Sequence, residues 1–119
     1  SASKKDIEIK LQKWLRGELE LYIYDRLAYY KKLINVKYNS VHIKFYKRKL
    51  GSCSYNGKLA FNVKIITMPK KVIDYIIVHE LCHLKHFNHS RDFWCLVENY
   101  CRDFKDQKKW IKKNQNYIL

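Results

Sequence analysis

The chain has 119 residues and a net charge of +14, from 25 lysines and arginines against 11 aspartates and glutamates. Its length fits one domain, and its 47% apolar and 15% aromatic residues exclude a disordered chain. No apolar run approaches the roughly 20 residues that span a bilayer, and no signal peptide is visible, so we predict a cytoplasmic protein with one domain over residues 1–119, minimal or excised from a longer chain.

Residues 4–34 are predicted to form one long helix, because apolar residues recur at three- and four-residue spacing from Ile7 to Ile34. The period changes after Val36, and apolar residues then alternate with polar ones, as in a strand. Asn56-Gly57 separates two such runs and predicts a hairpin turn. We therefore expect a small antiparallel sheet of about three strands within residues 36–66.

A second helix is predicted over about residues 69–87, with Pro69 in its first turn. Asn88 or Ser90 can cap a third helix, and a short basic helix that holds Trp110 and Ile111 follows. The order helix, sheet, helices predicts an α+β fold.

The most informative string is His79-Glu80-Leu81-Cys82-His83, which lies on the predicted second helix. Two histidines four residues apart project from one helix face, so both imidazoles can bind one ion. The carboxylate of Glu80 can reach a zinc-bound water without ligating the metal. The string therefore predicts a Zn²⁺ site at which Glu80 activates water for hydrolysis.

A tetrahedral catalytic zinc ion takes three protein ligands and keeps one open position. His89 would point away on an unbroken helix, but it can fold back over the metal if the chain turns near Asn88. We predict His89 as the third ligand, since three ligands in a row along one helix would give poor geometry. The other candidates are His86, Asp92, Glu98 and, more distantly, His42. His86, Asp92 and Glu98 are alternatively residues that orient a ligand or contact the substrate.

Four segments within about residues 40–115 carry a family resemblance: Gly51-Ser52-Cys53-Ser54, residues 78–86, Asn88-His89-Ser90 and Phe93-Trp94. Together they resemble the YgjP-like metallopeptidase domain, which belongs with the SprT-like and WLM minimal zincins. The resemblance implies a compact zincin-type α+β fold, zinc held by His79, His83 and His89, and Glu80 as general base. Leu50 departs from the family pattern, which has a tryptophan before Gly-Ser-Cys.

We predict a monomeric zinc-dependent metallopeptidase that acts on a polypeptide substrate. Three alternatives stay open: a zinc-dependent hydrolase of nucleotides of the pyrophosphatase type, a DNA-associated SprT-like protease, and a non-catalytic zinc-stabilised module that binds nucleic acid. The basic surface predicts attraction to nucleic acid or another polyanion and would suit the first two. The sequence has no Gly-rich phosphate loop and no carboxylate cluster for magnesium, which argues against nucleotides.

Overall fold

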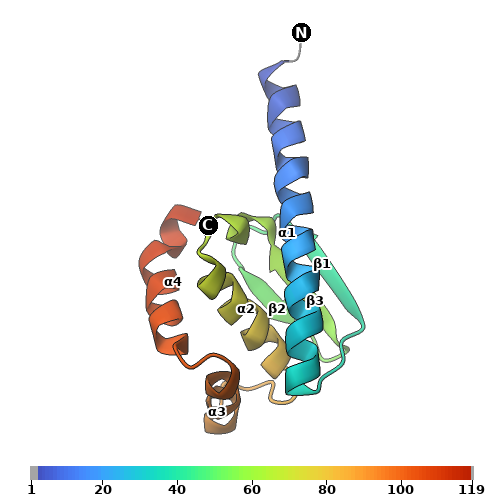
Figure 1. Cartoon of the computed structure of the whole chain (residues 1–119). Helices are drawn as coiled ribbons and strands as arrows, with labels where there is room; N and C mark the ends of the chain where they lie inside the picture. Colours follow the sequence, from blue (N-terminus) through green and yellow to red (C-terminus); the bar gives the residue numbers. More distant parts are fainter. Residues whose placement is uncertain (1–2, 119) are drawn as a thin grey trace.

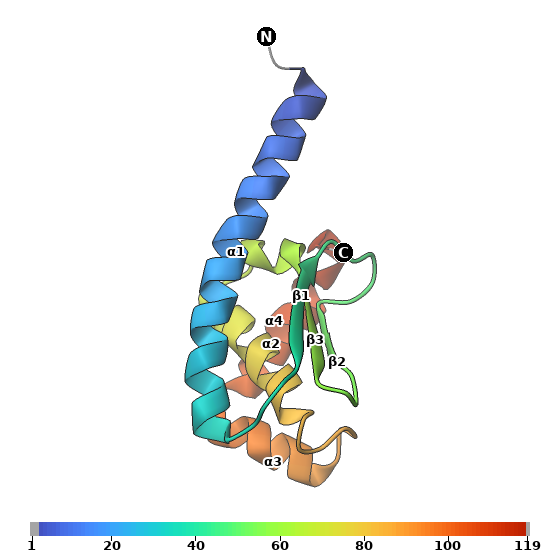
Figure 2. The same cartoon turned by 90° about the vertical axis from the view of Figure 1, so that its right-hand side faces the viewer.

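The computed structural model describes residues 3–118. Its elements in chain order are α1 (Lys4–Ile34), β1 (Ser40–Lys44), β2 (Gly51–Cys53), β3 (Lys58–Asn62), the 3₁₀ helix η1 (Val63–Thr67), α2 (Lys70–Cys82), α3 (Arg91–Tyr100) and α4 (Phe104–Ile118). The helices lie on one face of the sheet, and α2 lies between α1 and α4 (Figure 1, Figure 2). The predicted α+β fold is thus confirmed.

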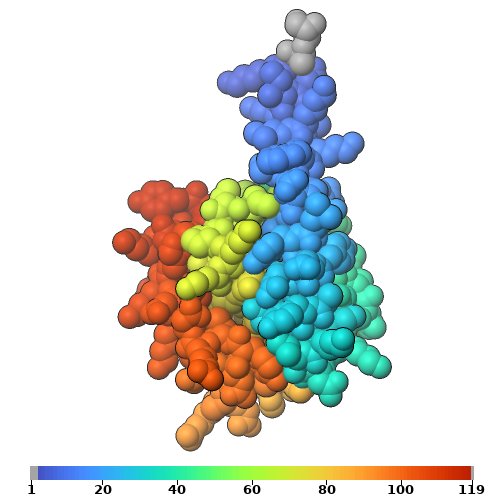
Figure 3. Space-filling model, viewed as in Figure 1, coloured from blue at the N-terminus to red at the C-terminus, as the bar shows by residue number. Residues whose placement is uncertain are grey.

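Helix α1 has the predicted bounds. Ser3 and Asp6 form a capping box at its start, and Asn35 ends it in the left-handed conformation, with φ 62°. Only the second half of α1 contributes to the core. Its buried positions are Leu19, Ile23, Leu27 and Ile34. The first half extends beyond the rest of the molecule (Figure 3).

The three strands form a mixed sheet in the order β1-β3-β2. The predicted hairpin is present: β2 and β3 are antiparallel, and Gly57 takes the positive φ, 78°, in the turn between them. The expectation that the whole sheet is antiparallel is wrong, because β1 pairs with the other edge of β3 in parallel. Strand β3 is buried at four of its five positions and therefore needs partners on both sides.

Helix α2 runs through the core, with nine of its 13 residues buried. It begins after Pro69, close to the predicted position, but ends at Cys82 rather than near residue 87. The amide groups of Lys85 and His86 both bond to the carbonyl of Cys82, which tightens the chain into a turn. This early end lets the following residues leave the helix axis and fold back over it.

The last two helices confirm the predicted cap and the predicted terminal helix. Ser90 caps α3, because its hydroxyl accepts a hydrogen bond of 3.3 Å from the amide of Phe93. Helix α4 packs against α2 and holds Trp110 and Ile111. Among the helices of residues 3–118, none is both long and apolar enough to span a bilayer.

Candidate metal centre and active site

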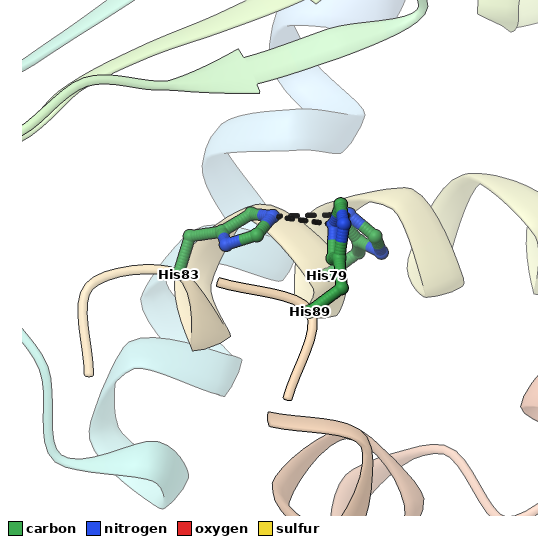
Figure 4. Close-up of side chains that lie close together, drawn as sticks. All are labelled: His79, His83 and His89. Carbon is green, nitrogen blue, oxygen red and sulfur yellow. Dashed lines mark hydrogen bonds between the residues drawn. The ribbon is translucent and has the colours of Figure 1, made fainter. Parts of the chain in front are cut away.

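The imidazoles of His79, His83 and His89 converge on one point (Figure 4). His79 and His83 lie one turn apart at the end of α2, and His89 comes from the loop that leads into α3. Their Nε2 atoms form a nearly equilateral triangle with sides of 3.2 Å (His79 to His83), 3.3 Å (His79 to His89) and 3.1 Å (His83 to His89). The turn after α2 thus brings the third histidine to the first two.

The size of this triangle fits a zinc ion. Two imidazole nitrogens bound to one tetrahedral Zn²⁺, each at about 2.0–2.1 Å, are separated by about 3.3 Å. The measured separations of 3.1 to 3.3 Å agree with this value. Three protein ligands are also the number that a catalytic zinc site uses, whereas a structural zinc site usually has four.

Burial keeps His79 and His83 in the neutral form that metal ligation requires. Burial and the two neighbouring imidazoles lower the pKa of His79 to about 3. Burial also lowers the pKa of His83. These two imidazoles therefore offer a lone pair to a metal at neutral pH without first losing a proton.

Hydrogen bonds at the opposite ring nitrogen orient two of the three histidines. His83 donates from Nδ1 to the backbone carbonyl of His86, at 3.1 Å, which leaves its Nε2 with a lone pair that can bind a metal. The Nδ1 of His79 lies 3.3 Å from the hydroxyl of Tyr75, a buried residue one turn earlier on α2. Sequence reasoning missed Tyr75, although its position four residues before a ligand histidine was a usable signal.

Aromatic side chains from the first turn of α3 hold the imidazole rings from the other side. Phe93 is fully buried and stacks on His83, with ring centroids 4.4 Å apart. Trp94 stacks on His89 at 5.7 Å and on Phe104 of α4 at 5.4 Å. The Phe-Trp pair therefore belongs to the core and fixes the ligand histidines at the same time.

Glu80 lies beside the histidines but outside their triangle. It is only 7% exposed, and burial raises the pKa of its carboxyl to about 8. Strand β2 covers it at Gly51: a Cβ atom there would lie 3.1 Å from Glu80 Oε2 and 3.2 Å from the Ala60 carbonyl oxygen. A side chain at this position would crowd the carboxylate, and glycine allows the strand to approach it this closely.

The other residues named from the sequence do not join the triangle. His86 contributes its backbone carbonyl, and His42 lies on β1 with its Nε2 3.2 Å from the hydroxyl of Ser40. Asp92 and Glu98 are exposed on α3, and within residues 3–118 neither hydrogen-bonds a ligand histidine. In the described part of the chain, the Tyr75 hydroxyl and the His86 carbonyl take the orienting positions that were predicted for these carboxylates.

Two adjoining clefts flank the site. The Phe87 cleft, of about 320 Å³, is lined by β2, the three histidines and Phe87. The Arg48 cleft, of about 300 Å³, is lined by residues 48–51, by α2 and by α4. Because Gly51, His79 and Glu80 line both clefts, one groove runs past the metal-binding nitrogens and the buried carboxylate.

Comparison with known proteins places this site in a family. No curated protein matches the chain. Among solved structures, the metallopeptidase zymogen jannalysin of Methanocaldococcus jannaschii is similar with 28% identity and a TM-score of 0.64, over 76% of this chain and 95% of that chain. The metallopeptidase zymogen abylysin of Pyrococcus abyssi shares the fold, with 24% identity and a TM-score of 0.64, over 78% of this chain and 95% of that chain.

The family itself is established by a match over nearly the whole chain. The model of the YgjP-like metallopeptidase domain covers residues 1–114, which include α1 and all elements that build the site. The resemblance predicted from the sequence motifs is therefore confirmed. With its three converging histidines and a fold shared with metallopeptidases, this chain belongs to the YgjP-like metallopeptidase family.

Proposed function

We propose that the protein is a zinc-dependent metallopeptidase in which His79, His83 and His89 hold the metal and Glu80 is the general base. The observation that carries this proposal is the Nε2 triangle, whose sides of 3.1 to 3.3 Å fit Zn²⁺, next to a buried carboxylate that is not part of it. Family membership supports the class of reaction.

When bound, zinc supplies a Lewis acid that brings the pKa of a coordinated water to about 7 and polarises a carbonyl. The chain supplies the rest. Glu80 accepts a proton from the attacking water and passes it to the leaving amine. Glu80 is buried against Gly51 beside the three imidazoles, where a bound dication would stabilise its ionised form, the form that accepts a proton.

The groove is the proposed binding position of the substrate. It runs along β2, an edge strand that pairs on one side only. An extended polypeptide can add to such an edge through backbone hydrogen bonds, which positions one peptide bond at the histidines without demanding a particular sequence. A polypeptide substrate therefore fits this groove.

The test measures zinc content and hydrolysis of an unstructured polypeptide for the wild type, Glu80→Gln and Glu98→Gln. We expect Glu80→Gln to retain about one zinc ion per chain and to lose at least about 100-fold in rate, as expected when a general base is removed. Glu98→Gln is the matched control, since Glu98 is exposed on α3. Equal activity of the wild type and Glu80→Gln would refute the assigned mechanism, and cleavage of nucleoside triphosphates but not of polypeptide would refute the substrate class.

A further inference from the structure

The two ends of the groove differ in charge. The Phe87 cleft has no lysine or arginine among its lining residues, and Phe87 there packs against Tyr55 with ring centroids 4.3 Å apart. The Arg48 cleft is lined by Arg48 and Lys49, and Glu80 is the one acidic residue that lines it. Among the residues that line the two clefts, the lysine and arginine side chains are therefore confined to the Arg48 cleft.

Lys49 is held at this place by its own contacts. Its ammonium group donates a hydrogen bond of 3.0 Å to the hydroxyl of Ser52 and lies 4.4 Å from the centroid of the Tyr46 ring. Burial raises the pKa of Glu80 and the positive charge of Lys49 lowers it, so the ammonium lies within electrostatic reach of this carboxyl.

Neither Arg48 nor Lys49 forms an ion pair within residues 3–118. All ion pairs within residues 3–118 involve Arg16 or Arg26, both on α1. Leu50, Ile76 of α2 and Ile111 of α4 give the Arg48 cleft an apolar patch beside its cations. An apolar patch next to cations that form no internal ion pair matches a short apolar stem that ends in a carboxylate.

We propose that the Arg48 cleft selects a substrate carboxylate on one side of the scissile bond, from an acidic side chain or from the C-terminus of the substrate chain. This inference rests on the proposed peptidase function and adds a substrate class to it. The reason is chemical complementarity: two cations that form no ion pair within residues 3–118 line the space that a residue beside the scissile bond would fill.

The experiment compares peptides in which one position carries Glu, Gln or Lys, moved stepwise along the sequence on both sides of the cleaved bond. Each peptide is made with a free and with an amidated C-terminus. We expect kcat/KM to be roughly tenfold higher for Glu than for Gln on one side only, since two partly exposed ion pairs each contribute modestly. A preference that requires the free C-terminus would assign the carboxylate to the chain end instead.

Three variants locate the effect. Arg48→Gln should reduce the preference for Glu to about twofold or less, and Lys49→Gln should act in the same direction. Lys47→Gln is the matched control, because Lys47 is an exposed neighbour in the same loop that does not line the cleft. The preference should also weaken as the salt concentration rises, because exposed charges are screened.

A direct binding measurement separates this proposal from the proposed function. The zinc-loaded Glu80→Gln protein is titrated calorimetrically with the Glu and Gln peptides, so that no turnover is needed. If the Glu peptide binds more tightly than the Gln peptide and Arg48→Gln abolishes the difference, the carboxylate pocket is supported, whether or not any peptide is cleaved. Absence of cleavage would overturn the proposed peptidase function but not the pocket. Equal binding and equal kcat/KM for the Glu and Gln peptides at every position would overturn the pocket. A preference for Glu on both sides of the cleaved bond that persists in Arg48→Gln would overturn it as well.

Discussion

The burial of Glu80 makes a quantitative prediction for the metal-free protein. The pKa of this carboxyl is about 8 in the folded state against an ordinary value of 4.5. Between these pH values the folded state keeps a proton that the unfolded state has lost, so the free energy of unfolding falls as pH rises. At 1.36 kcal/mol per pKa unit, the loss due to Glu80 is about 1 kcal/mol at pH 5 and about 3 kcal/mol at pH 7.

Glu80→Gln replaces the carboxyl by a neutral group of the same shape and should remove this pH dependence. In the presence of a chelator, the variant should be more stable than the wild type by about 3 kcal/mol at pH 7 and by about 1 kcal/mol at pH 5. Burial lowers the pKa of His79 to about 3, which reduces stability as pH falls below 6.5, but this loss occurs in both proteins and cancels in the difference.

Urea unfolding followed by circular dichroism, at half-unit steps from pH 5 to pH 8, measures the difference. Glu98→Gln is the control, and its difference from the wild type should stay small and constant with pH, because Glu98 is exposed. A Glu80→Gln protein that is less stable than the wild type at pH 7, or that differs by the same amount at every pH, would show that the carboxylate is solvated and that the burial argument is wrong.

Three further variants test the geometry of the site. Gly51→Ala places a Cβ 3.1 Å from Glu80 Oε2, and the Ala60 carbonyl oxygen, at 3.2 Å, prevents the new methyl group from moving away. We expect hydrolysis to slow by about 10- to 100-fold with zinc retained, and loss of zinc would contradict this expectation. Tyr75→Phe removes the hydroxyl beside a ligand imidazole and should weaken zinc binding about tenfold in a chelator competition, whereas unchanged affinity would exclude an orienting role. His89→Ala should lose zinc and His86→Ala should keep it, because His86 contributes only its backbone carbonyl to the site. Metal analysis of the purified variants measures this, and the reverse result would make His86 the third ligand.

The helices of this chain were predictable because each carries its own signals. The four-residue spacing from Leu19 to Leu27 gives the buried face of α1, and Ser90 gives the start of α3. The end of α2 was not predictable. No glycine follows Cys82, and the chain leaves the helix through a tightened turn whose amides bond to the last carbonyls, a device without a residue signature.

The strands were predictable, but their pairing was not. Alternation of apolar and polar residues shows which side chains face the core, whereas strand direction depends on which neighbour is adjacent. The Asn56-Gly57 turn determines the β2–β3 hairpin locally. The parallel pairing of β1 with β3 depends on the irregular connection over residues 45–50 and on the burial of β3, whose second edge needs a partner. Both are features of the tertiary structure and have no local sequence signal.

The site shows the same division between local and tertiary information. Helical geometry alone puts His79 and His83 on one face, so the sequence identifies this pair. The third histidine needs the early end of α2 and the packing of α3, where Phe93 stacks on one ligand ring and Trp94 on another. The Phe-Trp pair was visible in the sequence as apolar residues, but its contact with the ligands follows only from the docking of α3 on α2.

This packing explains why the site is complete only with a cation. Three imidazole nitrogens face one another at 3.1 to 3.3 Å, and the buried carboxyl of Glu80 lies beside them. Without a positive charge, the lone pairs repel and the carboxyl retains its proton, as its pKa of about 8 indicates. A bound dication would reverse both effects, because it would attract the lone pairs and stabilise the carboxylate. In the proposed mechanism, the arrangement that destabilises the metal-free fold is therefore the one that would bind zinc and free Glu80 to act as a base.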